Sequence, residues 1–268
     1  MSYRVYCDTI KSMLNSHRVN QDSLMFSEYA FMDDDAVKLM IVADGMGGLA
    51  KGEVASRNAV TGFLETFYSR MLDIYLKKKM EGFSLRYTVD EIERVMITSV
   101  QAANEKVCRE SEKYESTGTT ISVVCVVGDL AVYANVGDSP IYFYRNDQLE
   151  MVSKLQTLAE LNAEKEKYER YSSEYYDDEH ILYCYLGEYE NLSEEYIICS
   201  SIGKLKKGDS FLIGSDGAFG RIKDDDLRER LSEYLRDEDS EGFFLEQLFQ
   251  EARVDKDDDQ TAILYVVA

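Results

Sequence analysis

The sequence predicts an α+β fold in which two antiparallel β-sheets pack as a sandwich between pairs of antiparallel helices, in four layers α-β-β-α. Strand-like runs follow one another along the chain and helix-like runs do the same, whereas a parallel sheet would need the two to alternate. The strands also carry more apolar residues than one half-exposed sheet needs. With 268 residues, 45% of them hydrophobic, the chain is long enough to bury a large core.

The first half of the chain is predicted to begin with two strands and to continue with two long helices. The strand-like runs are 23–32 and 36–44. Apolar residues at helical spacing then mark the helices: Val60, Leu64, Phe67 and Met71 in the first, and Ile92, Met96, Val100, Ala103 and Val107 in the second. The segment before these elements, MSYRVYCDTIKSML, is interrupted by charges every few residues. It is therefore not a secretory signal, and no helix or strand is assigned to it.

The second half is predicted to be mainly strands. The strand-like runs are 119–128, 130–137, 141–146, 149–153, 181–187, 195–202, 210–217 and 261–268, with tight turns at Gly128-Asp129 and Asn146-Asp147. Two short helices are expected near 224–236 and 240–252. The polar stretch 158–180 has no clear apolar face and could form a short helix with an exposed lid, or a mobile insertion. With no repeat and no proline-rich linker, the simplest interpretation is one domain over residues 1–268.

The charge of the chain excludes several classes of partner. A formal net charge of -21 disfavours nucleic acid and an anionic membrane surface, because both bind through Lys and Arg. No apolar stretch approaches the length of a membrane span. The five cysteines are scattered, odd in number and without C-x-x-C spacing, which favours a reducing, cytoplasmic compartment. Oligomeric state is not readable from the sequence.

Several aspartates share one context, the end of a hydrophobic strand beside a turn residue. They are Asp22, Asp44, Asp138, Asp216 and Asp258. Any single one of them would be interpreted as a cap or turn residue. Five in different parts of the chain weaken that interpretation, because strand ends can converge at one edge of a sandwich. Converging carboxylates repel each other and need a cation or a shared proton to coexist.

The residue types indicate which cation such a cluster would hold. The only histidines are His17 and His180, and there is no H-x-x-x-H or Cys/His cluster, so zinc is disfavoured. Ligation by oxygen alone favours Mg²⁺ or Mn²⁺. Two such ions can share a bridging carboxylate and a bridging water, lower the pKa of that water and direct it at an electrophile such as phosphorus.

Six short motifs occur in order along nearly the whole chain. They are NQDS (20–23), VADGMGGLAKGEVAS (42–56), TGTT (117–120), NVGDS (135–139), GSDG (214–217) and DDQT (258–261). Together they resemble the metal-dependent protein phosphatases, the type 2C serine/threonine (PPM) family, and most of all its bacterial members. Each motif alone is weak, but all six in this order form a specific signal.

The resemblance implies a two-sheet sandwich with helix pairs outside and a binuclear metal centre at one end. It implies that Asp44 bridges two Mn²⁺ or Mg²⁺ ions and that the backbone carbonyl of Gly45 binds one of them. Asp216 and Asp258 would hold the other, and Asp22 would bind a metal or a metal-bound water. The implied reaction is hydrolysis of phosphoserine or phosphothreonine on proteins by a hydroxide bridging the two ions, without a covalent intermediate.

The resemblance also implies partners and a variable region. The expected partners are phosphorylated protein substrates, with a serine/threonine kinase and its targets as candidates. The acidic insertion near 153–180 corresponds to the variable flap of the family, and it is called the flap below.

The chain departs from the family at several positions. The arginine that binds phosphate usually lies five residues before the first aspartate, where this chain has His17, with Arg18 one step later. A one-residue shift reverses a side chain in an extended segment, so His17 and Arg18 are both candidates for binding phosphate. Pro140 and Gly220 replace a usual Arg and a frequent Asp. We therefore expect the third metal site implied at Asp138 to be weak or absent.

A dinucleotide-binding turn is one alternative for the glycine-rich segment. Residues 45–50, GMGGLA, fit G-x-G-x-x-A between a strand and a helix. However, Asp44 would place a negative charge beside the pyrophosphate, and the runs of strands oppose a doubly wound sheet.

The second alternative is a pseudophosphatase, an inactive binding or regulatory module on the same fold. His17, Pro140 and Gly220 favour it. Against it stand intact, mutually repelling carboxylates, which a scaffold without metal has little reason to keep. The active enzyme is therefore the preferred hypothesis.

Overall fold

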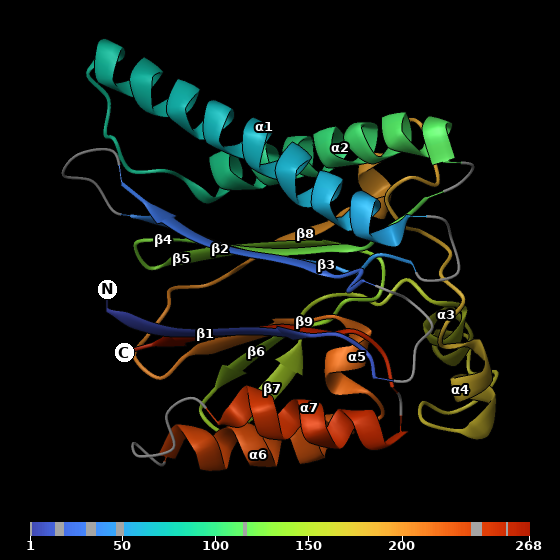
Figure 1. Ribbon diagram of the computed structural model, residues 1–268. Helices are drawn as coiled ribbons and strands as arrows, with labels where there is room; N and C mark the ends of the chain where they lie inside the picture. The colour runs from blue at the N-terminus through green and yellow to red at the C-terminus, as the bar shows by residue number, and fades with distance from the viewer. Residues whose placement is uncertain are drawn as a thin grey trace.

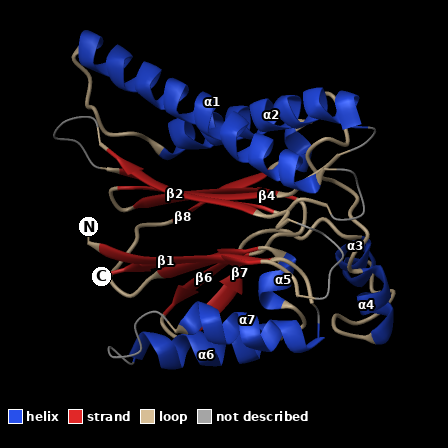
Figure 2. Ribbon diagram, viewed as in Figure 1, coloured by secondary structure: helices blue, strands red, loops and turns tan. Residues whose placement is uncertain are grey.

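A computed structural model describes residues 2–13, 19–30, 36–46, 51–114, 117–236, 243–255 and 257–268. Two five-stranded antiparallel sheets lie face to face, and helices cover the outer face of each (Figures 1 and 2). The predicted α+β sandwich is confirmed. No helix in the described ranges is long and apolar enough to cross a bilayer.

The upper sheet in Figure 1 has the strand order β2-β3-β4-β5-β8, and all neighbouring strands are antiparallel. Its strands are β2 (Ser23–Tyr29), β3 (Val37–Ala43), β4 (Ile121–Val127), β5 (Leu130–Val136) and β8 (Ile198–Ile202). The two long helices on its outer face are α1 (Gly52–Glu81) and α2 (Val89–Tyr114). Both helices fall where the apolar spacing predicts them.

The lower sheet has the order β1-β10-β9-β6-β7 and is also antiparallel throughout. Its strands are β1 (Tyr3–Ile10), β10 (Gln260–Val267), β9 (Ser210–Gly214), β6 (Ile141–Arg145) and β7 (Gln148–Met151). The helices on its outer face are α5 (Asp216–Phe219), α6 (Asp224–Arg236) and α7 (Phe244–Asp255).

The central strands are apolar on both faces because each face meets another layer. In β3, Leu39 and Ile41 pack against the helices, whereas Met40 and Val42 point between the sheets. Tyr265 of β10 reaches the same space from the opposite sheet and is almost fully buried. This arrangement accounts for the excess of apolar residues in the strands.

Three element assignments differ from the sequence prediction. Residues 3–10, to which no element was assigned, form the edge strand β1, where a half-exposed position tolerates the charges that interrupt the pattern. Residues 181–187 are not a strand, and they contribute only single bridging pairs at Leu182 and Leu186. The strand predicted over 210–217 ends at Gly214, and Asp216 begins α5.

The flap contains two short helices, α3 (Leu158–Glu164) and α4 (Ser173–Asp178), and lies at the same end of the sandwich as α5 (Figure 1). Each helix is capped by a hydroxyl: Thr157 accepts from the backbone N–H of Glu160, and Ser172 from that of Tyr175. After the flap, a 3-10 helix, η1 (Glu194–Tyr196), leads into β8. The short helix expected in this stretch is therefore present, and a second one follows it.

Candidate active site

Strand register places the predicted carboxylates at strand ends in pairs. Ser23 of β2 faces Ala43 of β3, so Asp22 and Asp44 lie at the same end of that strand pair. In the other sheet Gly214 of β9 faces Ala262 of β10, so the segments leading to Asp216 and Asp258 also leave together.

Hydrogen bonds join the two sheets at this end. The hydroxyl of Ser215, beside Asp216, donates to Oδ2 of Asp22 at 2.8 Å. The Asp259 carboxylate accepts from the backbone N–H of Gln21 at 2.7 Å and from that of Ser12 at 2.8 Å. Asp259 therefore positions the turn that carries Asp22, a role that the sequence prediction did not assign.

The TGTT motif fixes the backbone of Asp44. The Thr119 hydroxyl and the Thr120 N–H both donate to the Asp44 carbonyl, at 2.7 and 2.9 Å. The Asp44 N–H donates back to Thr120 Oγ1 at 2.9 Å, and that oxygen lies 2.6 Å from the hydroxyl of Ser139, the neighbour of Asp138. One threonine thus links the turns of two predicted ligands.

Two glycines allow backbone segments to approach closely here. A Cβ on Gly45 would lie 2.3 Å from the Gly52 carbonyl oxygen and 2.5 Å from that of Gln21. A Cβ on Gly217 would lie 2.1 Å from the Asp259 carbonyl oxygen and 2.9 Å from Cβ of Asp258. Because any larger residue would push these segments apart, the glycines set the distance between the strand ends.

The carboxylates are close enough to affect one another's ionisation. Burial raises the pKa of Asp44 well above its ordinary value, and four other carboxylates raise it further by their negative charge. These four are Asp22, Asp216, Asp138 and Asp258. The structure thus brings together the five aspartates that the sequence singled out, from both sheets, around Asp44.

Asp22 has an environment that suits a cation. Burial raises its pKa to about 7, although hydrogen bonds from Thr261 and Ser215 oppose this shift. Its second oxygen, Oδ1, is buried without a hydrogen-bond partner, and so is Oε1 of the adjacent Gln21. Buried oxygens without partners are costly, and a hard divalent cation would satisfy them.

No three His, Cys, Asp or Glu side chains in the described ranges are already spaced as ligands of one ion. Asp22 is turned toward Ser215 instead, in keeping with the repulsion between charged carboxylates. The donor chemistry therefore fits Mg²⁺ or Mn²⁺, with side chains that must reorient to ligate.

Comparison with known proteins decides the family. The sequence profile described as Protein phosphatase 2C matches residues 11–252. This chain belongs to the protein phosphatase 2C family. Protein phosphatase PhpP of Streptococcus pneumoniae is 24% identical over 193 residues, which are 71% of this chain and 71% of that protein.

Solved structures of protein phosphatases share the fold. The serine/threonine phosphatase of S. agalactiae superposes with a TM-score of 0.76 at 22% identity, covering 100% of both chains. The catalytic domain of serine threonine protein phosphatase PstP, solved in complex with two manganese ions, has a TM-score of 0.70 at 20% identity and covers 99% of this chain and 98% of that one.

Three of the residues that depart from the family pattern are His17, Arg18 and Gly220. His17 and Arg18 lie outside the described residues, so the choice between them remains a prediction. Gly220 has φ +55°, and a Cβ there would lie 2.6 Å from the carbonyl oxygen of Ala252. An aspartate would be strained in this backbone, so glycine suits the position in this protein phosphatase 2C chain.

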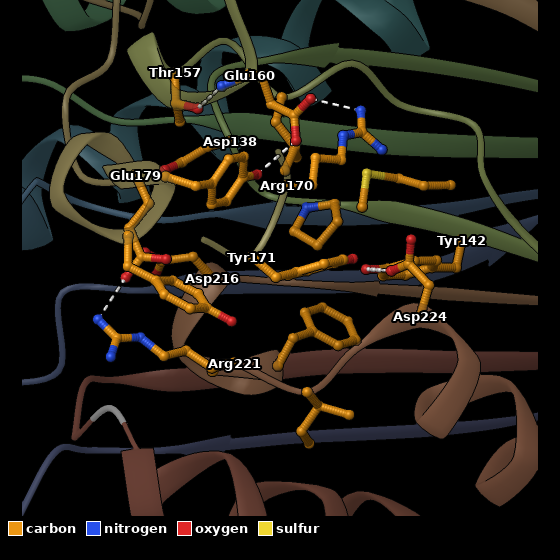
Figure 3. Close-up of a pocket in the computed structure, with 18 residues that line it drawn as sticks. Asp138, Tyr142, Thr157, Glu160, Arg170, Tyr171, Glu179, Asp216, Arg221 and Asp224 are labelled. Carbon is orange, nitrogen blue, oxygen red and sulfur yellow. Dashed lines mark hydrogen bonds and ion pairs between the residues drawn. The ribbon is translucent and has the colours of Figure 1, made fainter. Parts of the chain in front are cut away.

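A cavity opens beside the carboxylates, between the flap and the segment from Asp216 to Asp224 (Figure 3). Asp138 and Asp216 both line it, and its volume is about 100 Å³. A substrate with its phosphate at the predicted metal ligands would therefore have this cavity next to it.

Proposed function

We propose that this chain hydrolyses phosphoserine and phosphothreonine on proteins with two Mn²⁺ or Mg²⁺ ions held at one end of the sandwich. The observation that carries the proposal is the convergence of carboxylates on Asp44, with a buried Asp22 oxygen that lacks a partner. Membership of the protein phosphatase 2C family supports it, as do the activity in the name of PhpP and the two manganese ions of PstP.

The ligands would come from both sheets. Asp44 would lie between the two ions, the Gly45 carbonyl would bind one of them, and Asp216 and Asp258 would bind the other. Asp22 would complete the site directly or through water. Bound in this way, divalent ions lower the pKa of a coordinated water and polarise the oxygens of a phosphoryl group.

Other groups of the site hold the Asp44 backbone in position and determine where the leaving oxygen can obtain its proton. The backbone of Asp44 is fixed by threonine hydrogen bonds, which keep its carboxylate in place. Met46, directly after the predicted ligand Gly45, has a thioether that cannot donate a proton. We therefore propose that the leaving serine or threonine oxygen takes its proton from solvent.

The proposal also covers the extent of the catalytic domain, the third metal site, the cellular compartment and the source of the substrates. The whole chain, 1–268, would act as one catalytic domain with the flap at 153–180. Because Gly220 removes a possible ligand, Asp138 alone would bind a third ion weakly or not at all. Within the described residues none of the five cysteines forms a disulfide, which suits a reducing cytoplasm. A kinase with its targets would supply the phosphorylated proteins.

The direct test is turnover of a phosphothreonine peptide by the purified chain with millimolar Mn²⁺. Phosphate release should exceed that of Mn²⁺ alone, and EDTA should abolish it. The melting temperature should also rise on addition of Mn²⁺, because a ligand of the folded state stabilises it. Absence of turnover, together with binding of the phosphopeptide, would instead favour the inactive binding module.

A second test decides between His17 and Arg18. Each is replaced by alanine, and kcat and KM are measured on the same phosphopeptide. The residue that anchors phosphate should raise KM when removed, by about 10-fold for the loss of one charge-assisted hydrogen bond. If neither variant raises KM, phosphate is bound elsewhere.

A further inference from the structure

The cavity beside Asp138 and Asp216 has largely aromatic walls. Four tyrosines and one phenylalanine line it: Tyr142, Tyr171, Tyr175, Tyr176 and Phe219. Its volume of about 100 Å³ is several times the minimum of about 10–15 Å³ that one water needs, so it has room for a chain of heavy atoms.

Two of its carboxylates are neutralised by arginines. Arg170 forms an ion pair with Glu160 at 2.5 Å, and the Tyr175 hydroxyl donates to the same carboxylate at 2.5 Å. Arg221 pairs with Glu179 at 3.2 Å and lies over the ring of Tyr176 at 4.2 Å. These guanidinium groups are therefore occupied and offer little to an anion.

Asp224 is the third acidic residue of the cavity outside the predicted metal ligands. Its Oδ1 accepts a hydrogen bond from the Tyr142 hydroxyl at 3.0 Å. Within the part of the chain that the structure describes, no Lys or Arg lies within ion-pair distance of it. Asp224 is therefore the one acidic side chain of the cavity, apart from the predicted metal ligands, that pairs with no arginine in the described residues, and it is hydrogen-bonded to Tyr142 and Tyr171 instead.

Tyr171 extends across the cavity toward Tyr142 and Asp224 (Figure 3). Its φ of +65° is uncommon for a residue with a side chain, and such conformations persist only where the surroundings impose them. Burial, followed by the charge of Asp224, raises the pKa of Tyr171 to about 12, so its hydroxyl stays protonated at neutral pH. Tyr171 therefore lines the cavity as a neutral aromatic side chain, hydrogen-bonded to Asp224.

We propose that this cavity binds a lysine or arginine side chain of the substrate, close in sequence to the phosphorylated residue. The inference rests on the proposed function, because the phosphate places the neighbouring residue at the cavity. Aromatic faces with a carboxylate are the surroundings that a cation prefers. An acidic side chain would meet Asp224 and a chain of net charge -21.

The test compares phosphothreonine peptides that differ at one position. Lysine, leucine or glutamate is placed in turn one, two and three residues on either side of the phosphothreonine. We measure kcat/KM with Mn²⁺ and, in parallel, binding by fluorescence anisotropy. At one or more positions lysine should exceed leucine by about 10-fold, and glutamate should be poorest.

The assignment to Asp224 is tested with a matched pair of variants. Asp224→Asn should lower the lysine-to-leucine ratio about 10-fold. Asp225→Asn should keep it, because Asp225 lies on the same helical turn with its side chain 97% exposed. A wild-type ratio near one, or an unchanged ratio in Asp224→Asn, would overturn the proposal. The wild type should also hydrolyse p-nitrophenyl phosphate, which has no neighbouring residue to fill the cavity. If it does not, the proposed function is wrong, and the ratios of peptide affinities from anisotropy still test the selectivity of the cavity.

Discussion

Replacing Asp44 with asparagine is expected to reduce Mn²⁺-dependent hydrolysis of a phosphopeptide by at least about 100-fold. A carboxylate can neutralise and join two cations, whereas a neutral amide cannot. Losing even about 3 kcal/mol of the charge stabilisation that bound cations provide corresponds to this factor. The measurement is kcat/KM over a range of Mn²⁺ concentrations, because a variant that only binds metal weakly would recover at high concentration.

The same substitution should make the metal-free protein more stable. Asp44 is held among four other carboxylates, and its pKa in the folded state is raised by burial first and by their charge second. In the unfolded chain its pKa is about 3.9. Between these two pKa values the folded state binds more protons, so stability falls as the pH rises through that window. Asparagine removes this cost.

The expected result is therefore a higher melting temperature for Asp44→Asn than for wild type at pH 8 in EDTA, with a smaller difference at pH 5. Added Mn²⁺ should raise the melting temperature of wild type more than that of the variant. Asp225→Asn serves as the control, since its exposed carboxylate lies outside the site. A variant that is inactive but also less stable without metal at pH 8 would contradict this account of Asp44.

The sequence predicted the positions of the carboxylates because strand patterns are local. The apolar run that ends at Ala43 fixes where β3 ends, and therefore where Asp44 lies. Once strands 23–32 and 36–44 are recognised as a pair, their ends must lie together, as the facing of Ser23 and Ala43 confirms. The convergence of the two sheets could be inferred only as a possibility, because it depends on packing.

The residues that support the site could not be found in this way. Asp259 looks like a duplicate of Asp258 in an acidic run. Its separate role comes from the hydrogen bonds it accepts from the backbone N–H groups of Gln21 and Ser12, 238 and 247 positions away in the chain. Thr119 and Thr120 were recognised as part of a motif, but their bonds to Asp44 depend on the register between distant segments. Strand β1 was missed because an edge strand needs no continuous apolar run.

Gly217→Ala is expected to lower the free energy of unfolding by about 2–3 kcal/mol, the upper range for overpacking. The added methyl would lie 2.1 Å from the Asp259 carbonyl oxygen, and backbone cannot move aside as the end of a flexible side chain can. Gly203→Ala is the matched control, because nothing lies within 4 Å of a Cβ there. Urea unfolding of both variants should show a shift larger than about 1 kcal/mol only for Gly217→Ala.

The activity of Gly217→Ala tests what the close contact is for. If the added methyl separates the turn of Asp216 from Asp258, both carboxylates can no longer reach one ion, and the Mn²⁺ concentration needed for half-maximal turnover should rise. The Asp44 side of the site is held by threonines in the other sheet and should be unaffected. A Gly217→Ala variant that unfolds more easily but keeps the wild-type Mn²⁺ dependence would show that these two aspartates do not share an ion. The predicted ligand set would then have to be redrawn around Asp22 and Asp44.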